Sequence, residues 1–294
     1  TKDLEDLEKE IAELDEILKS KARIKTIIVK ELKSIAEKYG QPRKSIIIYD
    51  DVARYEEETV EIPDYPVNLF FTKEGYFKKI TPQSLRMSGE QKLKDGDEII
   101  QELEFTNNCD LLFFTDKCQV YKAKADDFAQ TKASVLGDYV AAKLGFDEGE
   151  NAVKMVVTKD YKGMLLFAFE NGKAAKVPLE SYATKTNRKK LTGAYSDKSP
   201  LVGLLYMPED EEVLFKASSG NMLLVHTGAL ALKTTRSTQG VAVLKPKKGH
   251  RLFSIERYKD GTFTNPKRYR TGSLPARGAL PVNDDSKDEQ LSLI

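Results

Sequence analysis

Apolar residues between Leu4 and Tyr39 recur at intervals of three and four, the spacing of amphipathic helices. The pattern predicts two helices with a break near Ser20, whose hydroxyl can cap the second helix by accepting a backbone N–H. Gly40 and Pro42 then end the second helix, with Gly40 in the position that favours a left-handed residue. Because the repeat is too short to sustain heptads, we favour a helical hairpin that packs on another element over a free coiled-coil dimer.

The composition changes over residues 41–66, which are acidic and carry Pro63 and Pro66. Proline favours an extended path, so this stretch is interpreted as a linker. Its carboxylates lack the ligand spacing and the glycine of a calcium loop, and we interpret them as solvated charges rather than metal ligands.

From Val67 onward, short apolar runs rich in Val, Leu, Phe and Tyr alternate with turn residues, which is the pattern of an all-β domain. Four stretches share one order: an apolar run, two mostly polar residues, a turn residue and a second strand. They are "LFFTKEGYFKKI", "LFFTDKCQVYKA", "LFAFENGKAAKV" and "LFKASSGNMLLV", with turn residues Gly75, Cys118, Gly172 and Gly220. Intervals of 43, 54 and 48 residues indicate propeller-like blades that pack side by side.

The four hairpins predict a mainly β fold of about four to five blades, with a degenerate fifth blade possible near Phe253–Arg270. The WD40 propellers are excluded on their motif, because the chain contains no Trp.

Alignment on the turn residue places a lysine at the fourth following position in three repeats and a leucine in the last. These residues are Lys79, Lys122, Lys176 and Leu224. Strict alternation puts them on a face with apolar neighbours, so we expect the lysines to lie where that face reaches the rim. Spacing alone leaves two interpretations open: solvated charges that discourage edge pairing, or a cationic track for the phosphates of a duplex.

The distribution of charge favours the second interpretation. The 47 basic and 46 acidic residues of the chain nearly cancel, but residues 67–258 hold 29 basic and 24 acidic side chains, whereas residues 1–66 hold 12 and 17. Loop cations that add to the track are Arg188, Lys189, Lys190, Lys233 and Arg236. Further basic groups are Lys245, Lys247 and Lys248, which precede His250 and Arg251, and Lys267, Arg268 and Arg270 near the end of the chain. Single-sign loops without an aromatic stacking motif fit sequence-tolerant binding of the backbone of double-stranded DNA.

No catalytic or metal-binding set emerges from the sequence. His226 and His250 lack partners at ligand spacing and are interpreted as structural or solvated. Cys109 and Cys118 are too few for a disulfide framework, which suits a reducing cytosol, and Cys118 is expected to have a structural role in its turn. With no apolar run of about 18 residues, we expect a cytoplasmic protein without a membrane partner.

Two groups of residues carry a family resemblance. "KELKSIAEKYGQPRKSI" at 30–46 resembles the end of the helical arm of the A subunit of bacterial type IIA topoisomerases. The repeated "FFT..GY.KK" pattern and "RSTQGVAVL" resemble the C-terminal β-pinwheel that DNA gyrase and topoisomerase IV A subunits share. The resemblance extends to about Tyr258, and a start at Thr1 within a helical pattern suggests a piece of a longer protein.

The resemblance implies a β-pinwheel, preceded by a short helical hairpin, whose rim binds and bends duplex DNA. Lys78 and Lys79 match the basic pair after the blade turn, Lys122 and Lys176 match its second member, and Arg236, Gln239 and Gly240 match a last-blade motif. The implied domains are the end of the arm at 1–40, the linker at 41–66, the pinwheel at 67–275 and an acidic, disordered tail at 276–294.

The resemblance also implies a place in an ATP-dependent type II topoisomerase. The catalytic tyrosine and the Mg²⁺ ligands of such enzymes belong to segments absent here, and ATP binds the partner B subunit. This chain alone is therefore expected to hold no cofactor and to leave DNA uncut, while the full A subunit forms a homodimer.

One departure from the family concerns gyrase. Gyrase A subunits carry a QRRGGKG-like box after the first blade hairpin, which is tied to wrapping DNA with a positive crossing. The corresponding "SLRMSGEQKLKDGDE" keeps only Arg86, Gly89 and Lys92, and we count Arg86 and Lys92 among the DNA-contacting residues. We therefore expect a topoisomerase IV-like role in relaxation or decatenation. The alternatives are a gyrase domain with a degenerate box and a blade-repeat scaffold for protein interactions.

Overall fold

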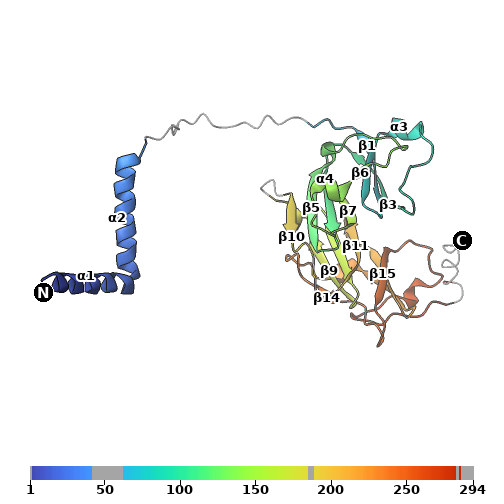
Figure 1. Cartoon of the computed structure of the whole chain (residues 1–294). Coiled ribbons are helices and arrows are strands. Elements are labelled where there is room, and N and C mark those ends of the chain that lie inside the picture. Colours follow the sequence, from blue (N-terminus) through green and yellow to red (C-terminus); the bar gives the residue numbers. More distant parts are fainter. Residues whose placement is uncertain (1, 42–61, 185–188, 283–284, 286–294) are drawn as a thin grey trace. The chain divides into compact units, whose positions relative to one another are not determined.

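A computed structural model describes residues 2–41, 62–184, 189–282 and 285 of the chain (Figure 1). The chain forms two compact units, Thr1–Val60 and Glu61–Ile294. Most of the expected linker at 41–66 and of the expected tail at 276–294 lies outside the described residues. None of the described helices has the length and apolar character needed to cross a membrane.

The first unit contains helices α1 (Lys2–Lys19) and α2 (Lys21–Tyr39). The Ser20 side chain accepts a backbone N–H from the first turn of α2 at 3.4 Å, which confirms the expected cap. Gly40 ends α2 with a φ of −63°, so the left-handed conformation expected there is wrong. Glycine is needed for another reason, since an added Cβ would overlap the carbonyl oxygen of Ala36. Neither helix buries a described residue, and the apolar stripe of both faces solvent.

The second unit contains the four hairpins expected from the repeats. Their strands are β1 (Pro66–Thr72) and β2 (Tyr76–Ile80), β4 (Asp110–Thr115) and β5 (Gln119–Lys124), β8 (Met164–Phe169) and β9 (Lys173–Pro178), and β12 (Glu212–Ala217) and β13 (Met222–His226). Positive φ is required at each turn residue, and Cys118 adopts it at 55° without being glycine. The repeat pattern therefore identified all four hairpins.

A third strand pairs with the first strand of each hairpin. These strands are β3 (Ile99–Thr106), β7 (Ala152–Thr158), β11 (Leu201–Met207) and β15 (Leu252–Arg257). They converge on one another: the Gln101 side chain of β3 exchanges hydrogen bonds of 2.8 and 2.7 Å with the backbone of Met155 in β7, and Gly203 of β11 lies against Ile255 of β15. The third strands thus form the inner edges of the sheets, and the opposite edges face outward.

The outer edge of each sheet is supplied by a segment from farther along the chain. The strands β6 (Asp138–Tyr139), β10 (Lys190–Thr192) and β14 (Val241–Ala242) each follow the next hairpin and pair back onto β2, β5 and β9. In the last sheet, bridges from Leu224 to Arg270 and from Met222 to Ala279 take this place. Residues Phe253–Arg270 therefore complete the fourth sheet, and the described chain contains no fifth blade.

The hydrophobic core lies between successive sheets. Phe71 of the first sheet contacts Phe113 of the second with ring centroids 5.7 Å apart, and Phe114 of the second contacts Phe167 of the third at the same separation. A third cluster joins the third and fourth sheets. No hydrophobic cluster among the described residues joins the first sheet to the last, so the packing follows chain order.

Candidate nucleic-acid interface

Four segments run from a 3-10 turn to the outer edge of a sheet, and we call them the return segments. The turns are η1 (Ala125–Asp127), η2 (Leu179–Tyr182), η3 (Thr227–Ala229) and η4 (Pro266–Arg268). Each return segment begins directly after its turn and ends in a glycine with positive φ: 128–137, 183–193, 230–240 and 269–278. Equivalent topology thus places the described parts of four stretches of similar length on the outer side of the pinwheel; of the second stretch, 185–188 lie outside the described residues.

The return segments contain nine basic residues and no Asp or Glu. The nine are Lys132, Lys185, Arg188, Lys189, Lys190, Lys233, Arg236, Arg270 and Arg277. In a chain whose charges balance overall, acid-free segments at equivalent outer positions generate a local positive potential, which attracts phosphates.

Each return segment contributes one cation whose side chain makes no bond to another described residue. These four are Lys132, Lys189, Lys233 and Arg277; three are exposed and Lys233 is half-buried. Lys189 and Lys233 were predicted from the sequence, whereas Lys132 and Arg277 were missed. The signal that identifies the missed pair is the recurrent acid-free stretch that ends in glycine. Lys185 and Arg188 lie outside the described residues.

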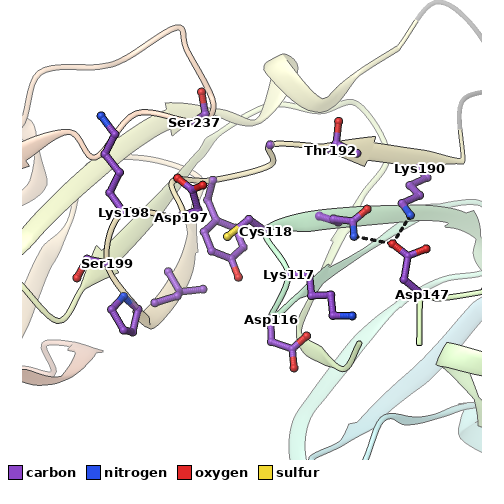
Figure 2. Close-up of a pocket in the computed structure, with 15 residues that line it drawn as sticks. Asp116, Lys117, Cys118, Asp147, Lys190, Thr192, Asp197, Lys198, Ser199 and Ser237 are labelled. Carbon is purple, nitrogen blue, oxygen red and sulfur yellow. Dashed lines mark hydrogen bonds and ion pairs between the residues drawn. The ribbon is translucent and has the colours of Figure 1, made fainter. Parts of the chain in front are cut away.

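Lys190 is held by an ion pair at the end of a groove of about 920 Å³ (Figure 2). Its ammonium lies 2.7 Å from Oδ2 of Asp147, which also accepts a hydrogen bond from Gln119 at 3.0 Å. The hydrogen bond between the pair lowers the pKa of Asp147 and raises the pKa of Lys190. Charged residues of both signs line the groove: Asp116, Asp147, Asp197, Lys117, Lys190 and Lys198. The groove is therefore not an anion pocket.

The residues matching the last-blade motif hold the third return segment in place. Arg236 donates a hydrogen bond to the carbonyl oxygen of Ser181 at 3.1 Å, and its guanidinium lies over the ring of Tyr182, 5.8 Å from the centroid. The Gln239 side chain accepts a hydrogen bond from Lys173 at 3.1 Å. Arg236 therefore has a structural role besides its charge.

Gly240 is the close contact between the third return segment and its sheet. It has a φ of 72°, and an added Cβ would overlap the carbonyl oxygen of Ala174. Gly193 ends the second return segment with a φ of 61°, and a Cβ added there would lie 4.0 Å from its nearest neighbour, Cβ of Ser237. We expect Gly240→Ala to lower the free energy of unfolding by about 3 kcal/mol and Gly193→Ala by about 1 kcal/mol, because only the first adds overlap to left-handed strain. Urea unfolding measures both, and equal losses would contradict this packing.

Lys79 is only 2% exposed, so its expected position at the rim is wrong. Its Nζ donates to Oδ1 of Asn107 at 2.6 Å and to the carbonyl oxygen of Ala125 at 2.7 Å. Both acceptors flank the hairpin of the second sheet. Burial lowers the pKa of Lys79, and the nearby Asp126 carboxylate opposes this shift.

Lys176 makes the same kind of connection from the third sheet to the fourth. Lys176 is 5% exposed, so the prediction that it lies at the rim is wrong as well. Its Nζ lies 2.9 Å from Oδ1 of Asp210 and donates to the carbonyl oxygen of Thr227 at 2.8 Å. Thr227 opens η3 as Ala125 opens η1, so the two lysines bind equivalent carbonyls. The hydrogen bond from Lys176 lowers the pKa of Asp210.

The other two lysines of the repeat are also withdrawn from solvent. Lys122 is half-buried and donates to Oγ1 of Thr184 in the second return segment at 3.0 Å. Lys78 is 1% exposed and donates to the carbonyl oxygens of Lys92 at 2.6 Å and Ala133 at 3.3 Å, which corrects its expected place at the rim. Burial lowers the pKa of both ammonium groups.

Leu224 now has a physical explanation. Among the described residues no sheet follows the fourth, so this position has no loop of a next sheet to bind. Leu224 instead packs in an apolar cluster with Leu214, Met222, Phe263 and Tyr269. The repeated lysine therefore connects one sheet to the next, because its ammonium group donates hydrogen bonds to acceptors beside the following hairpin. Its recurrence does not mark contacts with DNA.

Arg86 and Lys92 lie between the second and third strands of the first sheet. Arg86 is the last residue of α3 (Pro82–Arg86), and both side chains are exposed. Neither side chain bonds to another described residue. Both therefore stay available to an external anion.

The described residues show charge but no assembled reactive group. No group of three His, Cys, Asp or Glu side chains among them is placed to hold a metal. Burial raises the pKa of the Cys109 thiol to about 12 and also raises that of Cys118, so neither thiol is activated as a nucleophile.

Comparison with known proteins connects these features to a family, although no protein-family model matches the chain. The DNA gyrase A subunit of Streptomyces coelicolor is 27% identical in an alignment of 276 positions, which covers 88% of this chain and 32% of that subunit. The C-terminal domain of a DNA topoisomerase IV superposes with a TM-score of 0.59 at 24% identity, covering 68% of this chain and 63% of that domain. A DNA gyrase A C-terminal domain superposes with a TM-score of 0.51 at 18% identity, covering 73% and 76%. The expected β-pinwheel fold is confirmed.

Proposed function

We propose that this chain, a relative of the DNA gyrase A subunits over 88% of its length, is the domain with which a type IIA topoisomerase A subunit binds and bends duplex DNA. The observation that carries the proposal is the set of nine cations and no carboxylates in the return segments. Phosphates recur along a duplex whatever its sequence, so cations on successive outer edges favour binding without sequence specificity. A duplex that follows these edges must bend, and counterion release offsets part of the bending free energy.

The proposal assigns each part of the chain a place in a larger enzyme. Residues 1–40 are the end of the helical arm, and residues 67–275 are the DNA-binding pinwheel, to which 276–279 are added because Ala276 and Ala279 pair with its last sheets. DNA cleavage by a catalytic tyrosine and Mg²⁺, ATP binding by the B subunit and pairing of two A subunits belong to other parts of that cytoplasmic enzyme. The chain by itself is expected to bind DNA without cleaving it.

Within this proposal we favour a topoisomerase IV-like role over gyrase-like wrapping. Residues 81–98, which stand where a gyrase wrapping box is expected, hold three basic and four acidic residues. Lys94 is moreover paired with Glu74 at 3.6 Å, which leaves Arg86 and Lys92 as the free cations of this segment. A segment with no net positive charge contributes little to binding of the DNA phosphates at the first sheet.

Ligation of a nicked plasmid in the presence of the chain tests both the bending and its topology. We expect a bent but weakly wrapped duplex, so the linking number of the closed plasmid should change by much less than one for each bound chain. Energy transfer between dyes at the two ends of a linear duplex should increase on binding, because bending brings the ends together.

The two readouts separate the parts of the proposal. A positive linking-number shift that grows in proportion to bound chain would overturn the topoisomerase IV-like preference and leave DNA bending intact. Binding without any change in end-to-end transfer would contradict bending itself.

A further inference from the structure

Three segments cross from one hairpin turn to the next, and we call them the bridging loops: 140–151, 194–200 and 243–251. The first contains the short helix α4 (Val140–Leu144). Each begins with a backbone N–H that donates to the carbonyl oxygen of a turn residue: Val140 to Gly75, Ala194 to Cys118 and Val243 to Gly172, at 2.8–3.0 Å. Each ends with a carbonyl that accepts the N–H of the next turn: Asn151 from Asp116, Pro200 from Glu170 and Arg251 from Ser218, also at 2.8–3.0 Å. The three loops are therefore equivalent parts of the fold.

The charges of the bridging loops differ sharply despite their common backbone contacts. The first holds one basic and three acidic residues, the second one of each, and the third, "VLKPKKGHR", holds four basic residues and no acidic one. Since the same backbone hydrogen bonds form with a negative, a neutral or a positive loop, the fold does not require the cations of 243–251. The clustering of four basic residues in 243–251 is therefore better explained by binding of an anionic ligand than by the fold.

The cations of the 243–251 loop are free to meet a ligand. Lys245, Lys247, Lys248 and Arg251 are all exposed. Arg251 has a counter-charge in Glu170 at 3.6 Å, whereas the three lysine side chains make no bond to another described residue.

This loop starts beside the fourth return segment. Leu244 forms a parallel bridge with Ala276, and the backbone N–H of Lys245 donates to the carbonyl oxygen of Ala276 at 2.8 Å. Arg277, the free cation of that return segment, follows directly in sequence. The two sets of positive charge are therefore continuous at the outer edge of the fourth sheet.

We infer that the 243–251 loop is a second phosphate-binding element, which takes the backbone of the duplex from the fourth return segment and leads it across the hairpin turns of the third and fourth sheets. The inference rests on the proposed function. The negative charge of the equivalent loop 140–151 repels phosphates at the other end of the pinwheel, so the crossing is confined to the last sheets. Continuity with Arg277 favours DNA over an acidic protein as the ligand.

The test replaces Lys245, Lys247 and Lys248 together by glutamine in the full chain. Affinity for a fluorescein-labelled random-sequence duplex is measured by anisotropy over a series of salt concentrations. We expect the affinity to fall roughly tenfold or more at ~0.1 M salt and the slope of log K against log salt to flatten by about 2 to 3, because each lost phosphate contact contributes about 0.9. A Lys→Arg triple variant should restore both values.

A matched control replaces Lys2, Lys9 and Lys25 of the first unit by glutamine and removes the same net charge; its affinity should stay near that of the wild type. If the loop variant binds DNA as the control does, the inference is overturned while the proposed function stands. If DNA binding is unchanged but binding of labelled polyglutamate is lost, the loop serves an acidic protein, which also overturns the inference. If the wild type itself fails to bind the duplex, the proposed function falls first.

Discussion

Lys79→Met is expected to lower the free energy of unfolding of the pinwheel by about 3 kcal/mol. Methionine fills much of the same volume but leaves Oδ1 of Asn107, which Lys79 now satisfies at 2.6 Å, without a donor. The Ala125 oxygen loses its 2.7 Å bond from Lys79 and keeps only the bond from the backbone N–H of Phe128. A buried polar group without a partner costs about 1–3 kcal/mol, and the lost hydrogen bond to Ala125 adds about 1 kcal/mol. Lys79→Ala should cost more, since it also opens a cavity.

Lys176→Met should show a comparable loss with a pH signature. The hydrogen bond from Lys176 lowers the pKa of Asp210, so Asp210 loses protons more readily in the folded than in the unfolded chain. The pair therefore stabilises the fold above the usual aspartate range near pH ~4, and its contribution disappears as the pH falls through the lowered pKa. The difference in stability between wild type and Lys176→Met should shrink as the pH falls through that range.

Chemical unfolding measures both variants, with Lys259→Met as the matched control at an exposed lysine that makes no side-chain bond to a described residue. The control should change stability by less than about 0.5 kcal/mol. Below the unfolding transition, Lys79→Met should keep the wild-type salt dependence of DNA binding. If Lys79→Met left the free energy of unfolding unchanged but flattened the salt dependence of DNA binding, Lys79 would contact DNA at the rim, which would contradict its role between sheets.

The hairpins were predictable because their signals are local. Each hairpin joins apolar runs across a turn residue at a fixed offset, and a turn that needs positive φ selects glycine at three of four positions. The sheets that the hairpins build were not predictable in the same way. The outer strand β6 consists only of Asp138–Tyr139 and pairs with β2, about 60 residues earlier in the chain. Two residues are too few to show the alternation of apolar and polar positions that predicts a strand.

The lysines show where reasoning from the sequence reached its limit. Alternation correctly placed Lys79 on the face of Phe77, and both are buried. The inference to the rim followed from the high cost of burying a charge, which holds unless acceptors are supplied. The acceptors of Lys79 lie 28 and 46 residues later, on either side of the second hairpin, and only the packing of two repeats brings them near. Lys189, which is exposed, and Lys233, which is half-buried, could be nominated from the sequence because loop cations need no distant partner.

Removal of one free cation from every return segment is expected to have the largest effect on DNA binding. The variant carries Lys132→Gln, Lys189→Gln, Lys233→Gln and Arg277→Gln. None of these side chains bonds to another described residue, so the fold should be kept. If each cation meets one phosphate, the salt slope should flatten by about 3 to 4 and the affinity near ~0.15 M salt should fall roughly 10- to 100-fold.

The control for this variant removes the same charge from the first unit, through Lys2→Gln, Lys9→Gln, Lys25→Gln and Lys30→Gln. Its affinity should change by less than about threefold, because screening limits the reach of exposed charges to roughly 10 Å at ~0.1 M salt. Equal losses in the two variants would mean that net charge alone governs binding.

The central claim is that the return segments hold the phosphates of a duplex regardless of its sequence. It is tested most directly by the anisotropy titration of wild type and the four-site variant on two unrelated duplexes across the salt series. We predict the same steep salt slope on both sequences for the wild type, and the same flattened slope on both for the variant. A wild-type affinity that does not depend on salt, or a variant that binds as the wild type does, would contradict it.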